Sequence, residues 1–426
     1  MKRFSLSAPT RDRLDWLSQI GYVSVQLFLR NELTNHAAAI SFYFLLSIVP
    51  IVLLLLYAAN LLTQLPQLAA NMPLLFVALW DQLNLGALKA LGALPEQTRA
   101  VASGASLLTL LMASRGLLNA LQSAFRVIFA GGKRSFWQAW LMSLLAMPLA
   151  FALIVLAIVA QRILSYLSRM QLLGHHLAAN LGLAGGVLTF LVLWLLVFTA
   201  YWRMPIPRPP VRLAALVSLL CALSVLALKS AFGYFVRLDN YQEIYGTLGT
   251  VVFSLIWVYI VAVIFLLWAQ CLYAAGRVDV MGLEKLFLAS SGKQTSLADR
   301  FLFGRSQRLL RKYGQTYASG TTIIREGENS QLTYFLQSGQ VAMMKAFNGQ
   351  PVKITSLSAG QMFGEMAYLL GEPRTATVVA ETEVFLIAFP PQVLEELMAT
   401  SPALAREIIG ALAQRLKQMN LGRTHA

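Results

Sequence analysis

Long apolar segments fill most of the first two thirds of this chain. The clearest, Gly246 to Ala275, contains no Lys, Arg, Asp or Glu. A helix of about 20 predominantly apolar residues crosses the hydrocarbon core of a bilayer. Lipid offers no hydrogen-bond partners, so a crossing segment must satisfy its backbone groups internally, as an α-helix does. Segments of this kind therefore restrict this part of the chain to transmembrane helices.

Six segments fit or approach this length, and together they predict an all-α polytopic bundle of about six transmembrane helices. They are 37–62, 101–112, 139–167, 181–201, 213–235 and 246–275. The second is short, and we expect its helix to continue through the amphipathic stretch that follows. The composition agrees, because 12% of the residues are charged, about half the usual share in soluble domains.

Basic residues are unevenly placed along the chain, whose net charge is +15. Most of the excess lies before Phe287, in the N-terminal segment and in the loops after the second and fourth predicted spans. Lys- and Arg-rich loops stay in the cytoplasm. An even number of spans then leaves both termini cytoplasmic. We interpret the basic loops as partners of anionic membrane lipids and not of nucleic acid.

The N-terminal segment, residues 1–35, predicts a cytoplasmic amphipathic helix over Asp12 to Leu33. Its apolar positions recur at near-helical spacing: Leu14, Leu17, Ile20, Gly21, Val25 and Phe28. Such a helix either lies on the inner leaflet or packs against the bundle, and the spacing does not choose between the two. The polar start shows no pattern of a cleavable signal peptide.

The composition changes after Arg277, and we interpret residues 277–312 as a linker followed by a basic helix. Its basic positions are Arg300, Arg305, Arg308, Arg311 and Lys312. They indicate either a helix beside the inner leaflet or an ordinary solvated face.

Residues 313–420 show the alternating pattern of short strands between glycine turns. The strands are predicted at 334–336, 341–345, 352–357 and 384–388, and a helix at 391–419. Closely spaced strands and turns are typical of a β-roll or jelly roll. The sequence therefore predicts a multi-domain chain, with a β-roll domain and its flanking helices after the membrane bundle and a short tail at 421–426.

Residues Phe363 to Val378 read FGEMAYLLGEPRTATV, which places Glu365 and Arg374 on either side of a short apolar turn. A carboxylate accepts hydrogen bonds from hydroxyl groups, and a guanidinium pairs strongly with phosphate. A cyclic nucleotide requires both, for its ribose 2′-OH and its cyclic phosphate. The run therefore indicates a cyclic-nucleotide site.

Three segments of the membrane part resemble the BrkB/YihY family of bacterial inner-membrane proteins: SFYFLLSIVP (41–50), ASRGLLNALQSAF (113–125) and YGTLGTVVFSLIWVYIVAVIFLLWAQCLYA (245–274). The resemblance covers roughly the first 280 residues, and we assign residues 36–276 to this domain. It implies a multi-pass inner-membrane protein linked to envelope integrity, for which a transport role has been proposed. Some members were once labelled ribonuclease, but the four histidines here form no metal-ligand cluster. We expect neither an enzyme nor a metal site.

Residues 313–420 resemble the cyclic-nucleotide-binding domain of bacterial catabolite regulators and eukaryotic cyclic-nucleotide-dependent kinases. The resemblance implies that Glu365 holds the ribose 2′-OH and that Arg374 pairs with the cyclic phosphate. The backbone N–H groups of Gly364, Glu365 and Met366 would add to the anion site, Thr375 would donate to the phosphate, with Ala376 beside it, and Asn420 would reach the base. A Thr at the position of Thr375 also favours guanine, so the ligand is cAMP or cGMP.

No helix-turn-helix pattern follows the last helix, and no TVGYG-like filter occurs among the spans, so neither transcription factor nor channel is indicated. Our hypothesis is a transporter or lipid-handling envelope protein regulated by cytoplasmic cAMP or cGMP. The alternative is a non-transporting envelope scaffold or receptor with the same sensor. A homo-oligomer is left open.

Overall fold

A computed structural model of the chain describes residues 8–46, 104–129, 175–235, 238–290, 299, 302–303, 307–347, 350–402, 404–406, 408–410 and 413. The chain divides into two compact units, which we call the helical unit (Ser24–Ala274) and the β-roll unit (Met1–Val23 and Ala275–Ala426). Helices α1 (Ala8–Arg30) and α10 (Leu238–Ser290) contribute residues to both units. Each unit is described by itself.

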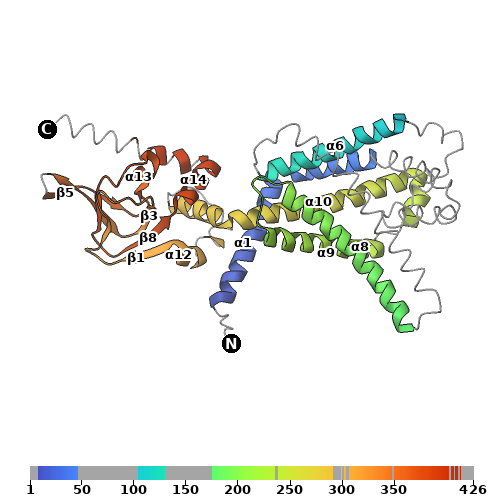
Figure 1. Ribbon diagram of the computed structural model, residues 1–426, viewed down its shortest axis with the longest axis horizontal. Helices are drawn as coiled ribbons and strands as arrows, with labels where there is room; N and C mark the ends of the chain where they lie inside the picture. Colours follow the sequence, from blue (N-terminus) through green and yellow to red (C-terminus); the bar gives the residue numbers. More distant parts are fainter. Residues whose placement is uncertain are drawn as a thin grey trace. The chain divides into compact units, whose positions relative to one another are not determined.

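The helical unit contains long apolar helices (Figure 1). Besides parts of α1 and α10, they are α6 (Gly104–Phe129), α8 (His175–Arg203), α9 (Val211–Phe235) and a helix over Leu33–Leu46. Among the described residues, three segments are long and apolar enough to cross a membrane: Ala184–Arg203, Val211–Ala231 and Val252–Phe287. They overlap the last three predicted spans.

The other three predicted spans are described less completely. The first is described only to Leu46, and 139–167 lies outside the described residues. The second belongs to α6, which continues as one helix to Phe129 as expected. The number six therefore stays a prediction.

Polar side chains connect the three helices that are long and apolar enough to cross a membrane. The indole of Trp194 in α8 donates to Ser218 Oγ in α9 at 3.0 Å, and Trp268 in α10 donates to Ser224 Oγ in α9 at 3.0 Å. The Tyr201 hydroxyl donates to the backbone carbonyl of Phe265 at 2.7 Å. In hydrocarbon, such bonds hold helices together because the alternative is an unsatisfied polar group.

Two of the sequence segments that carry the BrkB/YihY resemblance meet in this unit. A Cβ at Gly116 would lie 2.5 Å from Cδ1 of the Tyr43 ring. No side chain larger than hydrogen fits at position 116 without displacing the tyrosine, since real Cβ atoms do not approach this closely. Gly116, the glycine of ASRGLL, therefore allows its helix to pack closely against the ring of Tyr43, the tyrosine of SFYF.

The β-roll unit consists of two four-stranded antiparallel sheets, with orders β1-β8-β3-β6 and β2-β7-β4-β5. The strands are β1 (Gly314–Tyr317), β2 (Thr322–Ile324), β3 (Thr333–Ser338), β4 (Gln340–Phe347), β5 (Gln350–Ser358), β6 (Met362–Phe363), β7 (Thr377–Ala380) and β8 (Val384–Phe389). The helices are α12 (Gln307–Tyr313), α13 (Glu365–Leu370) and α14 (Pro391–Thr400). Strand and turn positions follow the predicted pattern of a β-roll with flanking helices, but α14 ends at Thr400, where the backbone of Ser401 is extended, and does not run unbroken over the predicted 391–419.

The C-terminal end of α10 packs into the core of the β-roll unit. Its Phe287 ring lies 4.3 Å, centroid to centroid, from Phe335 in β3 and 5.1 Å from Phe389 in β8. The buried side chains of this cluster also include Val280, Leu283, Leu286, Ile387, Leu394, Leu397, Leu404 and Ile408. The end of α10 is therefore part of the folded domain.

This packing changes the interpretation of residues 277–312. We predicted a linker from residue 277, but α10 is helical without a break from Leu238 to Ser290. Residues 291–298, 300–301 and 304–306 of the predicted linker and basic helix lie outside the described residues. Arg308 of α12 is largely covered and pairs with Asp279, whereas Arg311 and Lys312 are exposed and pair with Asp12 and Asp279, so this face of α12 is partly solvated, as described below.

Candidate nucleotide-binding site

The predicted site lies on a segment that passes from one sheet to the other. Strand β6 ends at Phe363 in the first sheet, α13 follows at Glu365–Leu370, and β7 begins at Thr377 in the second sheet. Phe363 is buried and stacks on Tyr334 of β3 at 5.4 Å. The core thus anchors both ends of the segment that carries Glu365 and Arg374.

Gly364 occupies a position that requires glycine. Its φ is 82°, in the left-handed region that side chains disfavour. A Cβ there would lie 2.7 Å from Arg374 Nη1 and 3.0 Å from the Leu332 carbonyl oxygen. The glycine therefore permits both the turn into α13 and the close approach of the arginine.

Arg374 directs its guanidinium toward the protein backbone. Nη1 donates to the Gly364 carbonyl at 2.7 Å, and Nη2 donates to the Leu332 carbonyl at 2.6 Å and to Ser330 Oγ at 3.1 Å. The side chain is 4% exposed. It is thus fixed against the start of β3, and an anion in solvent reaches it only if the guanidinium turns outward or the surrounding segment opens.

The backbone of Arg374 is held as firmly as its side chain. Its N–H donates to the Glu328 carbonyl at 3.1 Å, and its carbonyl accepts from the Gly327 N–H at 2.8 Å. Gly327 has a φ of 82° in the turn after β2. This turn, which lies between β2 and β3, therefore supports the arginine.

Glu365 begins α13 and is 2% exposed. Burial lowers the pKa of Arg374, and the neighbouring Tyr334, Glu328 and Glu365 raise it. An arginine keeps its charge at neutral pH despite such shifts. Glu365 and Arg374 are therefore close enough to interact electrostatically, and both lie beneath the surface.

The remaining predicted residues are placed differently. Met366 is half-buried, Thr375 is exposed and Ala376 is buried at the start of β7. Asn420 lies outside the described residues. Sequence reasoning missed Ser330 and Leu332, which hold the guanidinium. Every residue has a backbone carbonyl, so the sequence gives no sign that the carbonyl of Leu332 binds the guanidinium. Only the structure reveals this contact.

The donor set of Arg374 fits an anionic ligand. A guanidinium has five N–H donors, and the hydrogen bonds of this one to other described residues involve Nη1 and Nη2 only. Nε is buried and has no hydrogen-bond partner among the described residues. Buried donors are almost always paired. An unpaired arginine nitrogen beside the turn into α13 is the kind of group that a phosphate oxygen satisfies.

Together, the apolar helices and this site define a membrane protein with a built-in cyclic-nucleotide-binding domain. Comparison with known families agrees. Residues 24–279 match the family described as Virulence factor BrkB, and residues 314–401 match the cyclic nucleotide-binding domain. The first match covers more than half of the chain, so the chain belongs to the BrkB family. The second supports a cyclic nucleotide as the regulatory ligand.

Individual relatives match over short parts. A cAMP-dependent protein kinase regulatory subunit of Pyricularia oryzae is 34% identical over 25% of this chain and 27% of its own length. A cyclic nucleotide-gated potassium channel of Rhizobium etli is 39% identical over 21% of this chain and 24% of its own. The chain thus spans about a quarter of these curated relatives.

Among solved structures, the catabolite activator protein of Thermus thermophilus is 29% identical over 26% of this chain and 54% of its own, with a TM-score of 0.25.

Proposed function

We propose that this chain is a multi-pass protein of the bacterial inner membrane whose membrane domain is regulated by cAMP or cGMP. The carrying observation is the buried guanidinium of Arg374, which has an unpaired Nε and lies against the Gly364 carbonyl at the turn into α13. The BrkB family match and the apolar helices support the membrane location. Both termini lie in the cytoplasm in this proposal, because the basic loops favour it.

In this proposal, each residue of the site has its own role in binding the cyclic nucleotide. Arg374 pairs with the cyclic phosphate, and Glu365 accepts the ribose 2′-OH. The N–H groups of Glu365 and Met366 at the start of α13 add donors to the phosphate. Thr375 is exposed beside them and donates to the phosphate or to a guanine base. Whether the ligand is cAMP or cGMP depends on which base, adenine or guanine, the site accepts.

For the membrane domain, we propose a broad class of function, transport or lipid handling in the cell envelope. Apolar helices joined by polar contacts, such as that of Tyr201 with the Phe265 carbonyl, are compatible with a bundle that changes conformation. The alternative is a scaffold or receptor that transmits the signal without transport. We propose no enzymatic activity and no metal.

The decisive first experiment is calorimetric titration of the full-length protein in detergent with cAMP, cGMP and 5′-AMP. The full chain is needed because a fragment starting after Ser290 would lose Phe287 and its neighbours from the domain core. We expect one cyclic nucleotide to bind and 5′-AMP to bind much more weakly. Absence of heat with both cyclic nucleotides would disprove the proposal.

The Arg374→Ala variant tests the assigned contact. We expect its affinity for the cyclic nucleotide to fall by about 2 kcal/mol, or about 30-fold in Kd, the cost of losing a charged hydrogen bond. Arg325→Ala is the matched control, because Arg325 is exposed in the same domain. Equal affinities of the two variants for the cyclic nucleotide would show that Arg374 does not contact it.

Transport is tested separately, with protein reconstituted into lipid vesicles. The lipid or solute distribution is measured with and without the bound cyclic nucleotide. A distribution that changes with nucleotide supports regulated transport, and an unchanged one favours the scaffold.

A further inference from the structure

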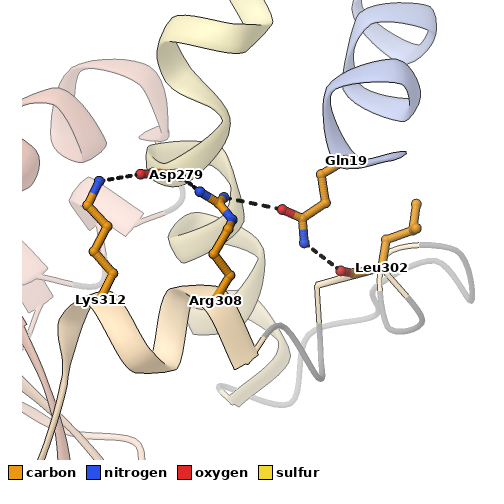
Figure 2. Close-up of polar contacts among 5 residues, drawn as sticks. All are labelled: Gln19, Asp279, Leu302, Arg308 and Lys312. Carbon is orange, nitrogen blue, oxygen red and sulfur yellow. Dashed lines mark hydrogen bonds and ion pairs between the residues drawn. The ribbon is translucent and has the colours of Figure 1, made fainter. Parts of the chain in front are cut away.

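The first part of α1 contacts α10 and α12 through a polar cluster within the β-roll unit (Figure 2). We call this cluster the α1 junction, and it consists of Asp12, Gln19, Asp279, Leu302, Arg308, Arg311 and Lys312. None of these residues belongs to the nucleotide site. The sequence suggested only an amphipathic helix and a basic helix here.

Asp279 is the centre of the α1 junction. It lies near the C-terminal end of α10, and its carboxylate pairs with Arg308 Nη1 at 2.6 Å and with Lys312 Nζ at 2.6 Å. The hydrogen bond to Asp279 raises the pKa of Lys312. Removing the carboxylate would leave two cations of α12 facing each other without their shared partner.

Gln19 joins α1 to this centre. The side chain is 0% exposed; its Nε2 donates to the Leu302 carbonyl at 2.8 Å, and its Oε1 accepts from Arg308 Nη2 at 3.3 Å. Figure 2 shows Arg308 between Asp279 and Gln19. A buried amide is costly unless both ends are bonded, so these partners specify the register of α1 against α12.

Two further contacts hold the same helix. Arg311 pairs with Asp12 at 2.7 Å. The Lys285 ammonium of α10 lies 4.8 Å from the ring centre of Tyr22 in α1 and 5.0 Å from that of Phe303, and it pairs with Asp299. The first part of α1 is therefore bound to the domain by charge as well as by its buried Ile20 and Val23.

Strand β3 connects the α1 junction with the nucleotide site. The Leu332 carbonyl, one residue before β3, accepts from Arg374. Within the strand, Phe335 packs on Phe287 of α10, and α10 also carries Asp279. If a phosphate drew the guanidinium away, the Leu332 carbonyl would lose its charged donor, and the start of the strand on which α10 packs would lose that contact.

We propose that the first part of α1, residues 8–23, is an internal partner of the nucleotide-binding domain, and that nucleotide binding changes the strength of this contact at the α1 junction. The inference rests on the proposed function. By thermodynamic reciprocity, a nucleotide that alters α1 docking has an affinity that α1 docking alters equally. The contact of α1 with α10 and α12 at the α1 junction is thus an output of the nucleotide-binding domain.

The test uses the full-length protein in detergent and two measurements, calorimetry for nucleotide affinity and hydrogen–deuterium exchange of peptides covering residues 8–23. The nucleotide is cAMP or cGMP, whichever binds the wild type more tightly. The variants are Asp279→Asn, which removes the shared charge, and Gln19→Met, which keeps the length of the side chain and removes both hydrogen bonds. The matched control is Glu381→Gln, because Glu381 pairs with Lys353 elsewhere in the domain.

We expect saturating nucleotide to change exchange of residues 8–23 in the wild type and in the control. In both junction variants, we expect faster exchange of residues 8–23 without nucleotide. We also expect a Kd altered by about fivefold or more, the lower range of allosteric coupling. Circular dichroism checks that the variants keep their helical content.

The outcomes separate the two proposals. If the wild type binds nucleotide but exchange of residues 8–23 does not respond, the inference is wrong and the proposed function stands. Unchanged affinity in both junction variants overturns it equally. If no nucleotide binds, the proposed function fails and the coupling fails with it. The exchange difference between wild type and Asp279→Asn then reports on docking alone.

Discussion

At the scale of single residues, the site is built from charges placed inside the domain. Arg374 and Glu365 are 4% and 2% exposed. Burying ionised groups costs free energy unless they are paired and hydrogen-bonded. The backbone carbonyls of Gly364 and Leu332 meet that need for the arginine. In the proposed function, nucleotide binding at Arg374 would therefore exchange existing contacts for new ones and give the ligand a way to alter the domain.

The role of Glu365 is testable with a ligand that lacks its target. For the wild type, we expect the 2′-deoxy form of the bound nucleotide to bind about tenfold more weakly, since a hydrogen bond to a charged group contributes about 1.5–3 kcal/mol. For Glu365→Ala, we expect the two ligands to bind equally. Calorimetry measures all four affinities. A 2′-deoxy penalty that persists in the variant would assign the ribose contact to another residue.

Gly364 offers a prediction on stability. Gly364→Ala combines a left-handed φ with a Cβ that meets Arg374 and the Leu332 carbonyl, whereas Gly371→Ala has φ 68° but nothing within 4 Å. We expect Gly371→Ala to cost about 1 kcal/mol for strain alone, and Gly364→Ala to cost more and to weaken nucleotide binding. Exchange protection of β3 and calorimetry provide the measurements. Equal costs at the two glycines would contradict the close approach.

At the scale of elements, α10 is the most informative. A helix that begins before an apolar span and ends in the core of the β-roll unit belongs to both units. The sequence predicted a boundary near residue 277, because charged residues return there. Instead, the buried positions Val280, Leu283 and Phe287 continue the helical period. They are hydrophobic because they pack against β3, β8 and α14, not against lipid.

Phe287 provides the test of this assignment. We expect Phe287→Ala to destabilise the β-roll unit by about 3–5 kcal/mol, because the ring fills a site between Phe335 and Phe389. Leu370→Ala is the control, since Leu370 is 59% exposed and surface truncations change stability by about 0.5 kcal/mol or less. Exchange protection of β3 and β8 reports the loss. Protection equal to that of the control would place α10 outside the core.

The strands were predictable in proportion to their length. Strands β3, β4, β5 and β8 are at least six residues long, and the four predicted strands lie within them. The two-residue strand β6 has no period to detect, and only its pairing with β3 defines it. Helix α1 was expected, but its packed face was not. Its buried side chains include Gln19 and Ser24, while Leu14 and Leu17 are exposed.

At the scale of the whole molecule, membrane orientation remains a prediction that can be tested. In a background lacking Cys221 and Cys271, we place single cysteines at Arg208 and Asn240, in the segments after the fourth and fifth predicted spans, which are predicted on opposite sides of the membrane. An impermeant maleimide added to intact cells should label Asn240→Cys and not Arg208→Cys, because Lys- and Arg-rich loops stay inside.

Cell lysis is the control for this experiment. After lysis, both cysteines should react, which shows that each is chemically accessible. Labelling of Arg208→Cys in intact cells would show that the orientation is the reverse of the predicted one. The nucleotide-binding domain would then lie away from cytoplasmic cAMP and cGMP.

By itself, the sequence determined the class of this protein. Apolar segments long enough for a bilayer and the run from Phe363 to Val378 are local patterns, and their chemistry depends little on what packs around them. Only the tertiary structure decided that Arg374 lies buried against the Leu332 carbonyl, that α10 completes the core of the domain, and that Gln19 and Asp279 tie α1 to α12. These arrangements join residues far apart in the chain. Their partners are backbone atoms and single polar side chains, whose pairing becomes visible only when the chain is folded.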